Sequence, residues 1–374
     1  MRKQAGFTMI EFMIAMGVTL VVIGAAVAAF MDTTRTNQRV SAAADMNDNL
    51  RAALNLVRQD IVVAGEGIPT GGISIPSGAG ITINRPGPTA LTFPQPFLPA
   101  ITLGTALGPK VAVLVSAAGG TAANSTTDEI TVAYADNTLG LDQAPINLPA
   151  GPGVPTPCAG SIKADTSSLT FDAAAGCVNL ASPTTTFKLN PGDLIMLSNI
   201  NGTAIQTVTS VAGQVVNFAK NTAIDKFGLN QTGAASGTLK QMQNKVPGSS
   251  PVTYDGTYPP TTATRIWMVS YYLDTVTDPK HIRLVRQINF NPAQPVAEII
   301  EALTFRYNFV DQSAVPIFYS NSATVPVGLT ENNIRSVNLF LGARASMGSP
   351  SNYQRDNMQT QISVRSLNYY NKYK

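Results

Sequence analysis

An apolar segment near the N-terminus constrains this chain more than any other feature. Residues 7–31 form a 25-residue apolar run with a single charge, Glu11. A six-residue leader, residues 1–6, precedes the run and carries Arg2 and Lys3. As a helix, such a run is about 37 Å long, enough to cross a bilayer. The basic leader predicts a cytoplasmic N-terminus, so we expect the chain after Met31 to lie on the other side of the membrane.

Glu11 is an unusual residue for such a segment. A carboxylate at membrane depth costs roughly 2.5–3.5 kcal/mol on insertion scales, so residues of this kind are rare and usually functional. A cation that meets the carboxylate inside the apolar phase would offset this cost. The alternative is a glutamate that stays protonated in lipid.

The residues around Glu11 resemble a known signal. The string Gly6-Phe7-Thr8-Met9-Ile10-Glu11 is similar to the cleavage and methylation signal of type IV prepilins. The resemblance implies that a prepilin peptidase cuts after Gly6 and methylates the new terminus at Phe7. It also implies that Glu11 meets the amine of Phe7 on a neighbouring pilin subunit, which would fix the stagger between their helices.

A secretory signal peptide is the main rival interpretation of the N-terminus. Its basic and apolar regions are present, and Ala26-Val27-Ala28 has the form of a cleavage site. Two features count against it: Glu11 would lie inside the apolar region, and the helical pattern does not stop at Ala28. This rival predicts a soluble secreted hydrolase whose mature chain begins at Ala29.

The helical pattern continues through residues 32–64 as an amphipathic segment. Its apolar side recurs at steps of three and four, at Val40, Ala43, Asn47, Leu50, Leu54, Val57, Ile61 and Ala64. Most charged residues, with Asp60 among them, are expected on the other faces. Gly65 and Pro69 then supply a stop. We predict one long helix within residues 7–65, about 87 Å long, whose stripe packs against the chain's own sheet rather than in a coiled coil.

The rest of the chain is predicted to be β-rich. Residues 66–262 alternate short strand patterns with Gly- and Pro-rich turns, and strands are clearest at 194–197, 204–211 and 214–218. Residues 263–374 carry longer strand patterns, with a register slip around Leu284-Val285. The predicted fold is α+β and pilin-like: a long N-terminal helix packed on a C-terminal antiparallel sheet, with a large β-rich insertion between them.

A second resemblance spans both ends of the chain. Its motifs are Arg58-Gln59-Asp60, Ala64-Gly65, Val269-Ser270-Tyr271-Tyr272, Leu284-Val285-Arg286, Ile300-Glu301-Ala302-Leu303, Phe305-Arg306-Tyr307 and Ile334-Arg335-Ser336-Val337. They are typical of PilW-type minor pilins, and the J-type minor pseudopilin of type II secretion is similar in the same places. The insertion lies outside the resemblance.

Two cysteines, Cys158 and Cys177, lie in the part expected outside the membrane. Exported proteins meet oxidising machinery, so we predict a disulfide between them, which would contribute roughly 3 kcal/mol in the chain-entropy model. Two separate buried thiols are the alternative. The sequence has no paired-cysteine or paired-histidine spacing beside them, and we expect no metal site.

Enzymatic and nucleic-acid functions find little support. The chain has one histidine, His281, and lacks the common nucleophile, zinc and phosphate-loop motifs. Asp128 and Glu129 are adjacent, so on a strand they would point to opposite faces. The net charge is +3 without a basic cluster, so we expect neither nucleic-acid binding nor a cofactor.

The resemblances imply a structural role. We expect a minor pilin that primes assembly of a type IV pilus and sits at or near the filament tip. Its expected partners are major and minor pilin subunits, the prepilin peptidase and the inner membrane, with the globular part periplasmic until assembly into a pilus at the cell surface. The alternatives are a minor pseudopilin of a type II secretion system and a tip adhesin that binds through residues 66–262.

Overall fold

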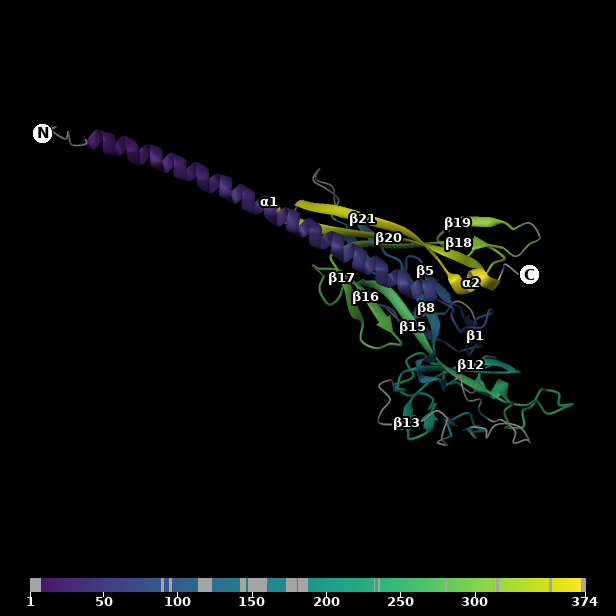
Figure 1. Cartoon of the computed structure of the whole chain (residues 1–374). Helices are drawn as coiled ribbons and strands as arrows, with labels where there is room; N and C mark the ends of the chain where they lie inside the picture. The colour runs from purple at the N-terminus through teal and green to yellow at the C-terminus, as the bar shows by residue number, and fades with distance from the viewer. Residues whose placement is uncertain are drawn as a thin grey trace.

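The long N-terminal helix is continuous. The computed structural model describes residues 8–88, 91–93, 96–113, 123–141, 146, 160–172, 180, 188–231, 233–234, 236–279, 281–311, 313, 316–349 and 352–370. Helix α1 spans Met9–Val63, 55 residues, and is capped by Ala64. Gly65 follows with φ of +81°, in the left-handed region that favours glycine. The expected unbroken helix and its stop are thus confirmed, and its N-terminal half projects away from the rest of the molecule (Figure 1).

The C-terminal half of α1 packs on a four-stranded antiparallel sheet. The strand order is β19–β18–β20–β21, with bounds β18 Ile300–Val310, β19 Phe318–Ser322, β20 Ile334–Ser349 and β21 Asn352–Ser363. On β20, Val337, Leu339 and Leu341 are buried in the core that also contains Leu50 and Val57 of α1. The alternate residues of β20 face outward, as the two-residue period of a strand requires.

A seven-stranded antiparallel sheet packs on the same core. Its described strands are β5 Ile101–Gly104, β8 Glu129–Asp136, β11 Leu194–Asn199, β12 Gly202–Thr207, β15 Thr262–Asp274, β16 Arg283–Ile288 and β17 Gln294–Glu298. β15 is central, since β8 pairs along one of its edges and β11 and β16 pair with it elsewhere. Strands from the expected insertion therefore pair directly with a strand of the expected C-terminal domain.

Strand β11 is buried on both faces. Leu194 and Met196 join one apolar cluster, and Ile195 and Leu197 join another. The second cluster also covers a peripheral four-stranded sheet, ordered β13–β14–β10–β9, with bounds β9 Ser161–Ile162, β10 Ser168–Thr170, β13 Ser210–Ala212 and β14 Val215–Asn217. This double burial explains why the segment is a continuous apolar run rather than an alternating one.

Short elements complete the described fold. They are the strand pairs β1 Ile73–Ser74 with β4 Phe97–Leu98, β2 Asn84–Arg85 with β3 Leu91–Thr92 and β6 Lys110–Val113 with β7 Ala123–Thr126; the 3-10 helices η1 Asn137–Leu139, η3 Leu239–Met242 and η4 Glu331–Asn333; and helix α2 Arg365–Tyr370.

The predicted α+β fold is confirmed, and two local expectations have distinct outcomes. The register slip expected at Leu284-Val285 is present as an irregularity between β16 and β17. The single strand expected over 204–211 is wrong, because the segment forms β12 and β13 in different sheets. At the end of β12, the Thr207 amide donates to the side-chain oxygen Asn230 Oδ1 over 2.9 Å, while Thr207 still lies opposite Leu194 of β11.

Candidate functional site

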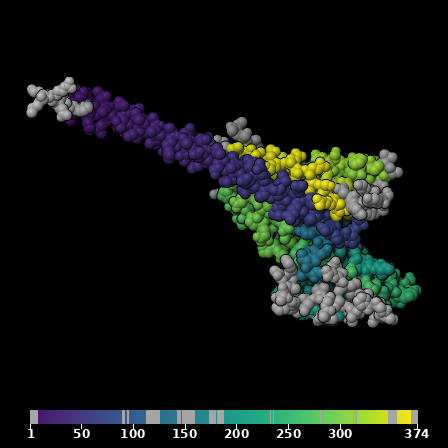
Figure 2. Space-filling view, viewed as in Figure 1, coloured from purple at the N-terminus to yellow at the C-terminus, as the bar shows by residue number. Residues whose placement is uncertain are grey.

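The N-terminal half of α1 is an apolar surface without contacts to the rest of the described chain. Its large side chains are exposed from the first turn onward, with Met9 at 84%, Leu20 at 68% and Phe30 at 73% exposure. The first buried residue of the helix is Met46. Among the described residues, α1 is the one helix that is long and apolar enough to cross a membrane. The bare half stands clear of the sheets in Figure 2.

Glu11 lies in the first turn of this helix and forms a capping box with Thr8. Its Oε2 accepts from the Thr8 amide at 2.9 Å and from the Thr8 hydroxyl at 3.0 Å, and its own amide donates to Thr8 Oγ1 at 3.4 Å. Within the described residues, Glu11 Oε1 forms no hydrogen bond, so one carboxylate oxygen is available to a partner. Gly6 and Phe7, the expected processing residues, lie outside the described residues.

The C-terminal half of α1 is fixed to the sheets by Asp60, which the sequence pattern placed on a polar face. That expectation is wrong: Asp60 is 4% exposed. Its Oδ2 accepts from Tyr271 Oη at 2.5 Å and from Arg286 Nε at 2.7 Å. Its Oδ1 accepts from Arg286 Nη2 at 3.1 Å and from Tyr134 Oη at 3.3 Å. A buried carboxylate with these donors is well compensated, because its charge is both paired and hydrogen-bonded.

The two tyrosines remain hydrogen-bond donors over the physiological range. Burial, followed by the charge of Asp60, raises the pKa of Tyr134 to about 12 and raises the pKa of Tyr271 further. Both hydroxyls therefore keep the proton that they donate to Asp60.

Motifs of the second resemblance meet in this cluster. Asp60 closes the first motif, Tyr271 comes from the Val-Ser-Tyr-Tyr string and Arg286 from the Leu-Val-Arg string. A further motif residue, Glu301, is also buried and accepts from Arg344 Nη1 and Arg355 Nε, each at 2.8 Å. The Asp60 contacts therefore join α1 to β15 and β16, whereas the Glu301 contacts join three strands of the four-stranded sheet, and both sets are buried rather than part of an open site.

The residues considered for catalysis are not brought together. His281 is exposed, with Nδ1 2.8 Å from Asp278 Oδ2. Asp128 pairs with Arg306, whereas Glu129 lies 3.5 Å from Arg85, so the adjacent carboxylates take different partners. Among the described residues, no group of three or more His, Cys, Asp or Glu side chains is arranged to hold a metal ion.

The expected disulfide stays a prediction. Cys158 and Cys177 both lie outside the described residues.

Comparison with known proteins adds one finding about the N-terminus. The family model for the prokaryotic N-terminal methylation motif matches residues 1–27. No curated protein and no solved structure matches the chain. The matched segment spans the leader and most of the apolar run, and it supports a type IV pilin-like prepilin. Together with the bare apolar helix, it supports a membrane-anchored subunit of the pilin or pseudopilin type.

Proposed function

We propose that the chain is a minor pilin of the PilW type, which primes assembly of a type IV pilus and sits at or near the filament tip. The observation that carries this proposal is the bare apolar half of α1, whose first turn contains Glu11. An exposed apolar surface of this extent needs a partner phase. Lipid would cover it before assembly, and the helices of other pilin subunits would cover it afterwards.

In this proposal, the chain starts as a single-pass protein of the inner membrane. Its leader is cytoplasmic and its sheets are periplasmic. The prepilin peptidase removes residues 1–6 and methylates Phe7, and the chain then passes into the pilus at the cell surface. The motif matched at residues 1–27 supports this processing.

Glu11 is proposed to set the register between α1 and a neighbouring pilin helix. The Thr8 groups occupy Oε2 and hold the carboxylate in a fixed orientation. The other oxygen would accept from the processed amine of Phe7 on the adjacent subunit. An ion pair inside an apolar bundle is sensitive to displacement, because a misplaced partner leaves a buried charge unpaired.

The shape of the head, by which we mean the chain without the bare half of α1, supports a position at the end of the filament. The insertion extends sideways from the axis of α1, well beyond the sheets that cover the helix (Figure 1). A subunit repeated along the filament body would need room for this lateral mass at every position. At the tip, the same mass meets no subunit above it.

The Glu11 role is tested with two substitutions and a matched control. Glu11→Gln keeps the capping box, since glutamine also accepts from the Thr8 amide, but it removes the charge. Glu11→Val removes both. We expect both variants to reduce the amount of this chain in sheared pili by about tenfold or more, as the loss of about 1.4 kcal/mol implies. Asp32→Asn, an exposed carboxylate farther along α1, should leave recovery unchanged. Wild-type recovery of both Glu11 variants would overturn the keying role.

The processing is tested by sequencing and weighing the mature protein. A methylated terminus at Phe7 is expected, whereas a terminus at Ala29 would identify a cleaved signal peptide and overturn the proposal. Recovery of the chain with pilus filaments is also expected. Recovery only with components of a type II secretion system would assign it instead to the minor pseudopilins.

A further inference from the structure

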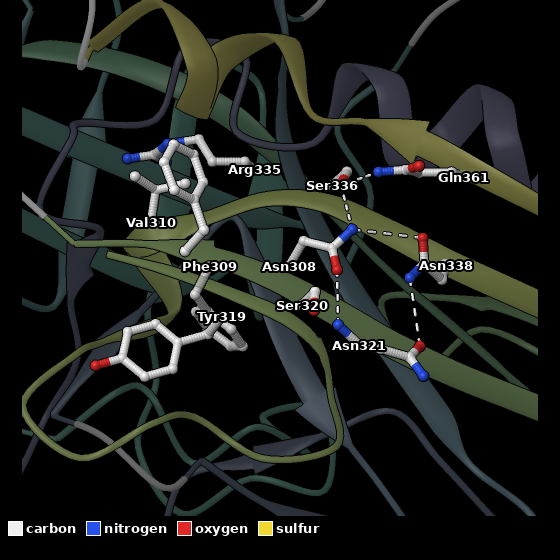
Figure 3. Close-up of a pocket in the computed structure, with 11 residues that line it drawn as sticks. Asn308, Phe309, Val310, Tyr319, Ser320, Asn321, Arg335, Ser336, Asn338 and Gln361 are labelled. Atoms are coloured by element: carbon white, nitrogen blue, oxygen red, sulfur yellow. Dashed lines mark hydrogen bonds between the residues drawn. The ribbon is translucent and has the colours of Figure 1, made fainter. Parts of the chain in front are cut away.

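The outer face of the four-stranded sheet carries a hollow of about 770 Å³, on the side away from α1. It lies where β19, β18 and β20 run side by side, and polar side chains from all three strands converge there (Figure 3). Its size is in the range of small-molecule sites, which are typically 300–1,000 Å³.

The hollow coincides with two irregularities in the sheet, one on each side of β18. Between Tyr307 and Phe309, the single residue Asn308 lies opposite both Ser320 and Asn321 of β19. On the other side, the pairing with β20 shifts after Asn308, which leaves Arg335 as the extra residue. Bulges re-aim side chains and are over-represented next to functional sites. Asn321 itself has φ of +56°, a conformation that asparagine adopts more readily than most residues.

A hydrogen-bond network holds the polar side chains of the hollow in place. Asn308 is its centre: its Nδ2 donates to Ser336 Oγ at 2.8 Å, and its Oδ1 accepts from the Asn321 amide at 2.7 Å. Gln361 Nε2 donates to Ser336 Oγ at 2.9 Å, and Asn338 Nδ2 donates to Asn321 Oδ1 at 3.4 Å. Within the described residues, Asn321 Nδ2 and Gln361 Oε1 form no hydrogen bond, so the network presents both a donor and an acceptor.

The chemistry of the hollow favours an uncharged ligand with many hydroxyl groups. None of the described residues that line it is a carboxylate. The one cation among the described lining residues, Arg335, directs Nη1 to the backbone carbonyls of Asn332 and Ile334, at 3.1 and 2.9 Å. Phe318 lies at the rim and is 75% exposed, so an aromatic ring is presented to solvent beside the amides.

We propose that this hollow binds a neutral oligosaccharide. Amide groups match sugar hydroxyls, because each side can donate and accept. The apolar C–H face of a sugar ring would pack on Phe318, whose ring face carries the negative part of its quadrupole. The site goes beyond a structural role in a filament, and it lies on the C-terminal sheet rather than in the insertion.

Binding is tested by calorimetric titration of the full-length chain in micelles of a detergent without sugar groups. The probes are maltohexaose, cellohexaose and chitohexaose, with hexagalacturonate as an anionic comparison. We expect saturable binding of at least one neutral probe and weaker binding of the anionic one. Because the purified chain is titrated, the result does not depend on whether the chain assembles into a pilus.

Two substitutions locate the site. Asn321→Gly removes an amide while tolerating the left-handed backbone, and Phe318→Ala removes the exposed ring; each should weaken binding at least about fivefold. Ile317→Ala changes the exposed neighbour of Phe318 outside the hollow and should leave affinity unchanged. Thermal unfolding of each variant verifies that it folds. If Phe318→Ala does not fold, the binding measured for Asn321→Gly decides the test. The proposal fails if no neutral probe binds at millimolar concentration, if hexagalacturonate binds most tightly, or if the folded variants bind like the wild type.

Discussion

At the scale of single residues, Glu129 is a buried carboxylate whose pKa is raised towards neutrality. It is fully buried on β8, and Arg85 Nη1 lies 3.5 Å from its Oε1. Neither carboxylate oxygen of Glu129 forms a hydrogen bond within the described structure. Burial therefore raises the pKa of Glu129 to about 7, although the charge of Arg85 acts in the opposite direction.

This raised pKa predicts a pH-dependent stability. Between about pH 4.5 and 7, the folded chain holds a proton on Glu129 that the unfolded chain has released, so the free energy of unfolding falls as the pH rises through this window. In the wild-type chain, the free energy of unfolding should fall by on the order of 2 kcal/mol between pH 5 and 8, and we expect Glu129→Gln to remove this fall. Thermal unfolding in detergent at several pH values measures this. Glu298→Gln, at an exposed site, should keep the wild-type slope, and an unchanged slope in Glu129→Gln would refute the assignment.

The sequence predicted one part of this arrangement. The expectation that Asp128 and Glu129 do not share a site agrees with their different partners, although Asp128 lies just before β8 rather than on it. The partner Arg85 was not predictable, because it comes from β2 and reaches β8 only through the packing of elements that are distant in the chain. Local period and spacing carry no information about such contacts.

At the scale of elements, α1 has two halves with different surroundings. The sequence predicted its length, its stop and an apolar stripe, and Leu50, Val57 and Ile61 of that stripe are buried. The stripe was wrong in detail, because the buried face also includes Met46, Ala53 and Asp60, whereas Val40 is 65% exposed. The spacing of Val57, Asp60 and Ala64 in steps of three and four was a signal for Asp60. Asp60 was nevertheless not expected in the buried stripe. The donors that compensate its buried charge lie on other elements, and the helix sequence alone does not reveal them.

We expect Asp60→Ala to loosen the attachment of α1 to the sheets. The change leaves Arg286 and Tyr271 without their acceptor, and breaking a buried pair of this kind costs about 3 kcal/mol. This is the lower end of the usual range, since the Arg286 side chain is 20% exposed. Thermal unfolding of the full chain in detergent measures the loss. Asp48→Ala, on an exposed part of the same helix, should change stability by less than about 0.5 kcal/mol, and equal effects would contradict the anchor.

At the scale of the whole molecule, the insertion and the C-terminal strands form one continuous structure. β15 joins them, since it pairs with β8 and β11 on the insertion side and with β16 on the C-terminal side. The sequence indicated the β-rich class and several of these strands. It did not indicate their order, because a two-residue period identifies the faces of a strand but not its neighbours.

Because the N-terminal half of α1 projects away from the sheets, we expect the head to fold without that half. Removal of residues 1–34 takes away only exposed side chains among the described residues, so the free energy of unfolding should change by less than about 0.5 kcal/mol. The same head should be monodisperse in buffer without detergent. Removal of residues 1–50 also deletes Met46 and Leu50 from the core and should cost at least about 2 kcal/mol. Equal unfolding temperatures for the two truncated chains would refute this division of the helix.

The attachment of α1 also gives the molecule a lever. From Met9 to Ala42, the bare rod is about 50 Å long at the standard helical rise. A tilt of about 10° at the head would swing its far end by about 9 Å, more than the 5.4 Å pitch of a neighbouring helix. The direction of this rod is set by the packing of the C-terminal half of α1 on the core, which includes the ion pair between Asp60 and Arg286. If α1 packs against a neighbouring pilin helix as proposed, this packing inside the head would influence which turn of that helix Glu11 can meet.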